Sequence, residues 1–337
     1  MKALRKLRSG KGNLALVDVP VPEIEPHEVL MKVWAVGICG SDLLIEDDKH
    51  FYKAPITLGH EFSGVAYKVG SKVKTIKEGD HIVGDIETEK GWLGVTRDGG
   101  YAPYMALPEK VIYKMPKEVS LDYAAVTEPV VATIHGMQER ANVKAGDFVV
   151  IVGPGPMGLM GVQFAKLRGA SKVALIGLKK DEKRLQVGKQ VGADYIFYSE
   201  EGPAEKIMDL TDGLGADFVL ECSASQEGVQ HAIDCARKAN EGEGGKGSVV
   251  FISLWGEKIS IKADAVSLGQ LSIFGSWSWN GSESWRRAVS LVSRNVFQLE
   301  PLITNRYRLE EWERAFIMLR EKKDIKALIY PNGTDWL

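Results

Sequence analysis

The sequence has few cysteines and no long apolar run, and each absence excludes a class of protein. Among 337 residues only Cys39, Cys222 and Cys235 occur, and no two of them form a Cys-x-x-Cys pair. A disulfide framework is therefore not expected, and a structural zinc site of four cysteines is excluded by counting. The basic start has no apolar stretch behind it, so we expect no secretory signal and a reducing, cytoplasmic location. No segment is apolar enough to predict a transmembrane helix.

The chain also lacks an excess of charge of either sign. It contains 43 basic and 45 acidic residues, for a formal net charge of −2. Neither nucleic acid nor a membrane surface is therefore an expected partner. The length exceeds that of one typical hydrophobic core, which favours two domains.

Two kinds of pattern divide the chain near residue 130. Before it, short strand-like runs such as 28–38 and 61–70 lie between turn residues, with little helical periodicity, which predicts a β-rich domain. After it, strands and helices alternate, as in 147–153 followed by 157–170. Such alternation predicts a parallel sheet with helices on both faces.

The alternating region extends to about residue 273, and a mixed pattern follows. Further strands are predicted at 172–178, 194–197, 216–223 and 247–253. The C-terminal part contains a predicted helix over 309–324 and a last strand over 325–331.

A glycine-rich turn joins the first strand and helix of the alternating region. Gly153, Gly155 and Gly158 form a Gly-x-Gly-x-x-Gly pattern directly after a strand and at the start of a helix. In that context the pattern predicts a dinucleotide-binding loop whose backbone approaches a pyrophosphate at the helix N-terminus. The alternative is a simple strand-turn-helix connection, which the context disfavours.

The end of the second strand bears on the choice of cofactor. An acid is expected there to bind the ribose hydroxyls, but Gly177 stands in its place, followed by Lys179 and Lys180, with Arg184 beyond. Without a carboxylate to repel it, a 2′-phosphate fits, which favours NADP over NAD. The alternative is that these cations are only the solvated start of a helix.

Four residues of the first part offer zinc-binding side chains. Cys39 and His60 lie 21 residues apart, Glu61 adjoins His60, and Glu128 lies where the two patterns meet, facing a predicted interdomain cleft. Thiolate, imidazole and carboxylate are the ligands zinc prefers. Spacing alone leaves another interpretation open, in which Cys39 is a buried apolar residue and His60-Glu61 an ordinary surface pair.

A set of ordered motifs makes the chain resemble the zinc-dependent medium-chain alcohol and polyol dehydrogenases, the sorbitol and threonine dehydrogenase branch in particular. The motifs are "GICGSD", "GHEFSGVAYKVG", "GDHIVG", "DGGYAPY", "EPVVATIH", "VVIVGPGPMG", "VLECSAS" and "IFGSW". The resemblance implies an α/β protein in which a GroES-like catalytic domain (1–132 and 274–337) flanks a doubly wound Rossmann domain (133–273).

The resemblance also implies the metal ligands. Cys39 and His60 match zinc ligands of the family, and Glu61 and Glu128 match carboxylates of its sorbitol and threonine dehydrogenase branches. Because zinc with Cys⁻, neutral His and one Glu⁻ is formally neutral, we expect one glutamate to bind at a time. The other would hold a water or exchange with it during turnover.

Further roles come from the same resemblance. Asp42 matches an acid that bonds the metal-bound histidine and fixes its tautomer, and Ser41 matches the hydroxyl that contacts the substrate oxygen. Lys326 matches a basic position that reaches the cofactor phosphates, with an ordinary surface lysine as the alternative. The loop and the "IFGSW" stretch imply further cofactor contacts from the following residues: Gly153, Gly155, Pro156, Met157, Gly158 and Phe274.

The chain departs from the family in two places. The stretch 85–98 contains no cysteine, whereas the family usually carries a four-cysteine lobe with a structural zinc there. We therefore expect one catalytic zinc and no structural zinc. Leu44 occupies the position of a relay histidine, so the proton must leave through Ser41, water, the cofactor ribose or a glutamate.

The sequence thus predicts a cytoplasmic enzyme that transfers a hydride between a secondary alcohol and NADP, with NAD possible, forming a ketone reversibly. A polyol or sugar alcohol is the expected substrate, and a homo-oligomer, dimer or tetramer, the expected assembly. Alternatives are an L-threonine 3-dehydrogenase-like activity, a zinc-free NADPH reductase and a non-catalytic dinucleotide-binding protein. Trp277, Trp279 and Trp285 could stack on a sugar face, although packing is the favoured interpretation.

Overall fold

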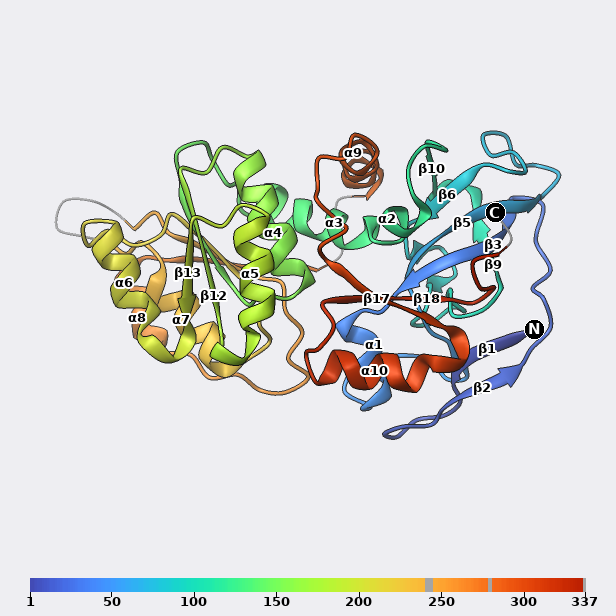
Figure 1. Ribbon diagram of the computed structural model, residues 1–337, viewed down its shortest axis with the longest axis horizontal. Helices are drawn as coiled ribbons and strands as arrows, with labels where there is room; N and C mark the ends of the chain where they lie inside the picture. The colour runs from blue at the N-terminus through green and yellow to red at the C-terminus, as the bar shows by residue number, and fades with distance from the viewer. Residues whose placement is uncertain (240–244, 278–280, 336–337) are drawn as a thin grey trace. The chain divides into compact units, whose positions relative to one another are not determined.

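The structure is a computed structural model that describes residues 1–239, 245–277 and 281–335. The chain forms two compact units, and the first takes residues from both ends of the sequence. Unit 1 comprises Met1–Glu128 and Trp285–Leu337, and unit 2 comprises Pro129–Ser284 (Figure 1). The domain boundaries expected from the sequence, 132/133 and 273/274, stay a prediction; the units divide at 128/129 and 284/285.

Unit 1 is built on a mostly antiparallel sheet that both ends of the chain supply. Its strand order is β10-β6-β5-β3-β18-β17, with β9 also paired to β3. The C-terminal strand β18 runs antiparallel to β3, with Leu328 opposite Gly37. The strands are β3 (Glu28–Gly37), β5 (Glu61–Val69), β6 (His81–Gly84), β9 (Tyr104–Pro108), β10 (Ile112–Met115), β17 (Ile303–Arg308) and β18 (Lys326–Tyr330).

Smaller elements complete unit 1. Unit 1 also contains the three-stranded sheet β2-β1-β4 and the two-stranded sheet β7-β8. Their strands are β1 (Lys2–Lys6), β2 (Leu14–Asp18), β4 (Ile56–Thr57), β7 (Glu87–Thr88) and β8 (Gly91–Trp92). The helices of unit 1 include α1 (Gly40–Glu46), α2 (Leu121–Ala125) and α10 (Trp312–Arg320). Two helices cross the unit boundaries: α3 (Thr127–Ile134) continues into unit 2, and α9 (Gly281–Ser293) begins there. The sequence showed little helical periodicity over residues 1–130, and the short α1 and α2 were not predicted.

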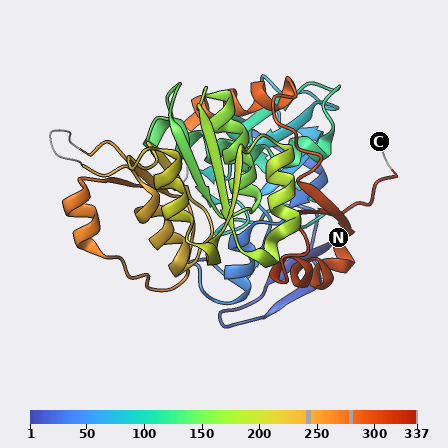
Figure 2. The same cartoon turned by 60° about the vertical axis from the view of Figure 1, so that its left-hand side comes forward.

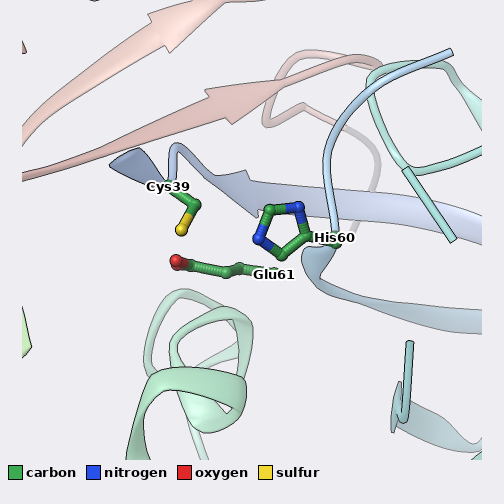
Figure 3. Close-up of side chains that lie close together, drawn as sticks. All are labelled: Cys39, His60 and Glu61. Carbon is green, nitrogen blue, oxygen red and sulfur yellow. The ribbon is translucent and has the colours of Figure 1, made fainter. Parts of the chain in front are cut away.

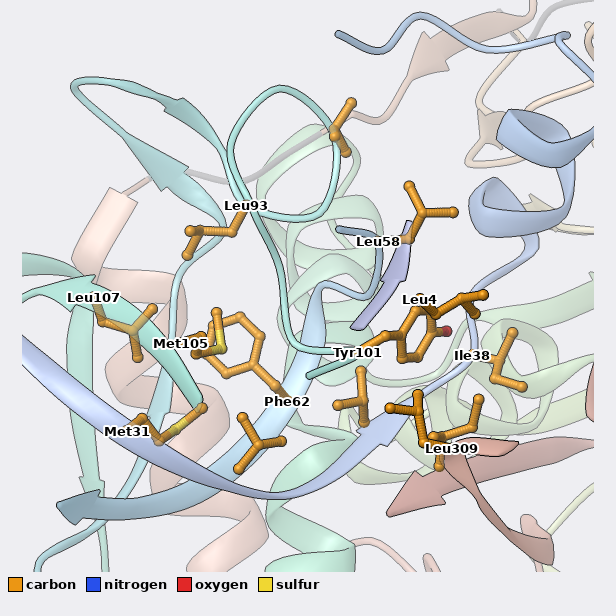
Figure 4. Close-up of a cluster of buried hydrophobic side chains, with 14 of the residues drawn as sticks. Leu4, Met31, Ile38, Leu58, Phe62, Leu93, Tyr101, Met105, Leu107 and Leu309 are labelled. Carbon is orange, nitrogen blue, oxygen red and sulfur yellow. The ribbon is translucent and has the colours of Figure 1, made fainter. Parts of the chain in front are cut away.

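The core of unit 1 joins residues that are far apart in the sequence. Leu4, Met31, Phe62 and Tyr101 are at most 3% exposed, and Leu309 from the C-terminal part packs with them (Figure 4). Burying one such side chain stabilises a fold by roughly 1.5–3 kcal/mol. This core fixes the ends of β3 and β5, where the candidate metal ligands lie.

Unit 2 is a parallel sheet with helices packed on it, as the alternating pattern predicted. The order is β13-β12-β11-β14-β15-β16, all pairs being parallel. The five residues of β11 are all buried, which is typical of a strand covered on both faces. The strands are β11 (Phe148–Val152), β12 (Lys172–Gly177), β13 (Tyr195–Tyr198), β14 (Phe218–Glu221), β15 (Ser248–Phe251) and β16 (Ser272–Gly275).

Helices cover both faces of this sheet, and Figure 2 shows its strands side by side. They are α4 (Pro156–Leu167), α5 (Glu182–Gln190), α6 (Pro203–Leu210), α7 (Gln226–Cys235) and α8 (Ala263–Gly269). The strand order reverses between β12-β11 and β14, and doubly wound sheets bind ligands at the carboxyl ends of the strands at such a point. Within the described residues, no helix is both long and apolar enough to cross a membrane.

Candidate active site

Three potential metal ligands converge in unit 1. Cys39 is the N-cap of α1, Glu61 is the first residue of β5, and His60 directly precedes this strand. One ligand atom from each lies within 4.8 Å of the other two, and they form the one such group found among the described residues. Figure 3 shows a ring nitrogen of His60 facing Cys39 and Glu61. Gly59, with φ +89°, makes the turn that places His60.

The buried carboxylate of Asp42 ties α1 to the His60 segment. Its Oδ2 accepts a hydrogen bond from the backbone N–H of Cys39 at 3.0 Å, and its Oδ1 lies 3.7 Å from Nδ1 of His60. On the other side of the ring, Oγ of Ser41 lies 3.4 Å from Nε2 of His60. Asp42 therefore faces the back of the imidazole, while Ser41 lies on the side of the candidate ligands.

The carboxylate of Glu61 is held by Lys326, the first residue of β18. Nζ of Lys326 lies 2.7 Å from each carboxylate oxygen and donates to the carbonyl of Ile38 at 3.0 Å. Both side chains are buried, at 3% and 1% exposure. These acceptors match the three donors of an ammonium group. The sequence did not predict this pair, and the predicted contact of Lys326 with the cofactor phosphates stays a prediction.

A close approach of the backbone makes room for Glu61. A Cβ atom added to Gly37, the last residue of β3, would lie 2.3 Å from Oε2 of Glu61. Because Gly37 is paired with Glu61 across the sheet, only a residue without a side chain leaves the carboxylate in place beside Lys326.

The electrostatics of the site favour a cation. Burial by itself lowers the pKa of His60, but Cys39 and Asp42 raise it well above its usual value. Burial raises the pKa of Glu128 to about 7, against the opposing attraction of His60 and Lys326. Glu128 lies in the first turn of α3 and interacts with Glu61 through its charge, but it is outside the 4.8 Å group. Its role as a ligand stays a prediction.

The residues present fit a zinc ion. A thiol, an imidazole and a carboxylate are zinc ligands, and three protein ligands with one open position are typical of catalytic zinc. Within the described part of the chain, Nδ1 of His60 and Oδ1 of Asp42 are buried without a hydrogen-bond partner. A shift of a few tenths of an ångström would join them, giving the carboxylate–histidine arrangement that orients metal-bound histidines.

In unit 2 the predicted glycine loop has the geometry of a phosphate-binding turn. Gly153 has φ +108°, Gly155 is the N-cap of α4 and Pro156 is its first residue. A Cβ on Gly158 would lie 1.9 Å from the carbonyl oxygen of Gly153, whereas one on Gly155 would meet nothing within 4 Å. Gly158 thus allows close packing of helix and turn, and Gly155 leaves open space above the backbone.

The predicted cofactor cations follow β12. Gly177 ends this strand, and a Cβ there would lie 2.8 Å from Cγ of Pro154 in the loop. Nζ of Lys179 lies 2.9 Å from Glu201, and the backbone N–H of Lys179 donates to Glu200 at 3.2 Å. Acidic residues therefore share this edge with the cations. Of the other predicted contacts, Lys180 lies in the short helix after β12, Arg184 in α5, Met157 in α4 and Phe274 in β16.

The tryptophans proposed as a sugar platform have different positions. Trp285 is 1% exposed and stacks on Tyr113 at 5.1 Å between ring centroids. This supports the packing interpretation for Trp285. Trp277 is exposed, and Trp279 lies outside the described residues.

Comparisons with known proteins agree with a candidate metal site in unit 1 and a candidate dinucleotide loop in unit 2. A family described as the alcohol dehydrogenase GroES-like domain matches residues 25–117, and one described as zinc-binding dehydrogenase matches 156–294. The fold and the two sites define a dinucleotide-linked oxidoreductase with a metal centre. The chain belongs to the zinc-dependent medium-chain dehydrogenases and is an enzyme.

Relatives resemble the chain over nearly its full length. A sorbitol dehydrogenase of Halalkalibacterium halodurans is 32% identical over 98% of this chain and 99% of its own. An L-threonine 3-dehydrogenase of Bacillus licheniformis is 34% identical over 98% of this chain and 99% of its own. A crystal structure from Sinorhizobium meliloti, described as a zinc-binding dehydrogenase bound to NADP, superposes with a TM-score of 0.86 at 28% identity, covering 98% and 99% of the two chains.

Proposed function

We propose that the enzyme oxidises a secondary alcohol of a polyol or sugar alcohol to a ketone, reversibly, with one zinc ion at Cys39, His60 and Glu61. The observation that carries the proposal is the convergence of these three ligand atoms, backed by Asp42. When bound, zinc supplies a Lewis acid for the alcohol oxygen and the nicotinamide cofactor supplies the hydride acceptor.

The protein's own residues orient the substrate and move the proton. Ser41 lies beside Nε2 of His60, so its hydroxyl can accept the proton of the substrate alcohol at Oγ and pass it on. Leu44 cannot relay a proton, so water, the cofactor ribose or a glutamate takes it from Ser41. Either Glu61 or Glu128 would be the third ligand beside Cys39 and His60, one glutamate at a time, and Lys326 would hold Glu61 while Glu128 is the ligand.

The substrate class is tested by a panel of alcohols offered to the zinc-loaded enzyme. We expect polyols with a secondary hydroxyl to give the highest kcat/KM, above plain alkanols and above L-threonine. Ser41→Ala should lower kcat by at least about 100-fold, as loss of a proton-transfer group does. No nicotinamide-linked oxidation of any secondary alcohol would contradict the proposal.

A second candidate is oxidation of an amino alcohol such as L-threonine, favoured by the identity to the Bacillus licheniformis relative over 98% of the chain. A kcat/KM for L-threonine above that of every polyol in the same panel would support this candidate instead.

NADP is the proposed cofactor, because Gly177 leaves the end of β12 without a carboxylate and Lys179 and Lys180 follow it. Lys180→Ala should raise KM for NADP by about five- to tenfold and leave KM for NAD unchanged, since one exposed ion contact is lost. Lys172→Ala, at the opposite end of the same strand, is the matched control. An equal change for both cofactors would contradict this preference.

The proposed setting is a homo-oligomer, a dimer or a tetramer, in a reducing cytoplasm. The three cysteines are free thiols, which suits such a compartment. Strand β16 ends the order of its sheet, and Leu268 on the preceding helix α8 is 80% exposed, which suits an interface. Sedimentation of the purified enzyme as a monomer at micromolar concentration would contradict the assembly.

A further inference from the structure

A buried tyrosine hydroxyl shares the carboxylate that faces His60. The O–H of Tyr101 donates to Oδ2 of Asp42 at 2.8 Å, and both residues are fully buried. The same oxygen accepts the backbone N–H of Cys39, so Oδ2 has two donors. This leaves Oδ1 as the oxygen directed to Nδ1 of His60.

Tyr101 is also attached to the segment that carries His60. Its backbone N–H donates to Leu58 at 3.0 Å, and Gly100 donates to Gly59 at 2.8 Å. A Cβ on Gly59 would lie 2.9 Å from the Tyr101 ring, so the ring packs directly on the turn before His60. Figure 4 places this ring among buried side chains that include Leu4 and Ile38. One side chain therefore contacts both segments that build the metal site.

We propose that Tyr101 is a positioning residue of the metal site, acting through Asp42, an inference that rests on the proposed zinc-dependent function. Its hydroxyl holds the carboxylate in the one rotation that offers Oδ1 to Nδ1–H of His60. That bond keeps the proton on Nδ1 and leaves Nε2 free to face Cys39 and Glu61. A phenylalanine at position 101 would fill the same space in the core but would not donate the hydrogen bond that fixes the Asp42 carboxylate.

The test is zinc affinity, measured by competition with a chromogenic chelator on the full-length enzyme. We expect Tyr101→Phe to bind zinc about tenfold more weakly than wild type, at the lower end of the 10- to 100-fold cost of losing an outer-shell partner. Tyr307→Phe is the matched control, because its hydroxyl also donates to a buried carboxylate, Asp324, at 2.6 Å. It should bind zinc as wild type does.

Two further readouts separate positioning from general stability. With Co²⁺ in place of zinc, Tyr101→Phe should shift the visible absorption bands of the metal, and Tyr307→Phe should not. In a double-mutant cycle, adding Tyr101→Phe to Asp42→Asn should weaken zinc binding less than twofold, since Tyr101 acts through that carboxylate. Additive losses, equal losses in both tyrosine variants, or wild-type zinc affinity in Tyr101→Phe would overturn the proposal.

Failure of this inference is distinguishable from failure of the proposed function. If the wild-type enzyme binds one zinc and oxidises a secondary alcohol while Tyr101→Phe matches it in affinity and spectrum, only the role of Tyr101 is wrong. If the wild-type enzyme holds no zinc, both are wrong. If Tyr101→Phe does not fold while Asp42→Asn does, the tyrosine is structural and the positioning role is overturned.

Discussion

The two units build their sites by opposite means. In unit 1 the site consists of side chains from segments far apart in the sequence, and Lys326 holds Glu61 while Tyr101 holds Asp42. In unit 2 the predicted dinucleotide loop consists of backbone, and the residues on which its conformation depends are glycines. Substitutions that remove a polar side-chain group should therefore disrupt the site in unit 1. Substitutions that add a side chain to a glycine should disrupt the loop in unit 2.

The loop of unit 2 gives the largest expected effect on cofactor binding. In Gly158→Ala the added Cβ would lie 1.9 Å from the carbonyl oxygen of Gly153, which is a severe clash. In Gly155→Ala the added Cβ would have no neighbour within 4 Å. We expect Gly158→Ala to cost about 3 kcal/mol of stability or more and to weaken NADPH binding at least ~100-fold. Gly155→Ala should keep wild-type stability and still weaken NADPH binding, because its methyl group enters the space of the pyrophosphate.

Thermal unfolding and NADPH fluorescence titration measure the two effects separately. If Gly155→Ala bound NADPH with wild-type affinity, the pyrophosphate would not lie beside Gly155, and the predicted role of this loop would be contradicted.

In unit 1 the buried ion pair between Lys326 and Glu61 should be the most sensitive to removal of a group. Lys326→Met leaves a buried carboxylate without its partner, which typically costs about 3–5 kcal/mol. Zinc should restore part of that loss, because the released carboxylate can bind the metal. Lys2→Met, which breaks an exposed pair with Asp18 at 2.6 Å, should cost at most about 1 kcal/mol.

Urea unfolding with and without zinc gives these values. If Lys326→Met and Lys2→Met lowered the free energy of unfolding equally, burial of the Lys326–Glu61 pair would not determine its contribution to stability.

A smaller effect concerns the pH dependence of stability in the zinc-free enzyme. The folded state holds the proton of Glu128 more tightly than the unfolded chain, since burial raises its pKa from 4.5 to about 7. Its contribution to stability is fully present below about pH 4.5 and is lost as the pH rises through about 7. Glu128→Gln should therefore lose less stability than wild type between pH 5.5 and pH 8.

Glu118→Gln, at an exposed position, serves as the control and should follow the wild-type pH profile. If the stability of wild type and of Glu128→Gln changed with pH in the same way, the pKa of Glu128 would not be the cause of the pH dependence.

The same contrast explains what the sequence could predict. The alternation of strands and helices and the glycine spacing are local patterns, and the parallel sheet of unit 2 follows them. The β-rich nature of unit 1 was predicted from short runs between turn residues. Helix α1 was not, because seven residues are too few to show a helical period, and its acid Asp42 caps the helix while also facing His60.

The candidate metal ligands were predicted only through the resemblance to a family, since Cys39 and His60 come from separate segments whose meeting no local pattern encodes. The partners of those ligands were harder still. Tyr101 and Lys326 lie 40 residues or more from the residues they hold, and a buried lysine or tyrosine has no distinctive sequence context. The glycine at position 37, opposite Glu61, was the available signal of a close approach.

The most direct test of the central claim is the zinc content of the purified enzyme. Elemental analysis of wild type, Cys39→Ser and Cys222→Ser compares loss of a ligand thiol with loss of a thiol in unit 2. The account predicts about one zinc per chain in wild type and in Cys222→Ser, and loss of zinc together with alcohol oxidation in Cys39→Ser. A zinc-free wild type, or a Cys39→Ser enzyme that keeps both zinc and activity, would contradict it.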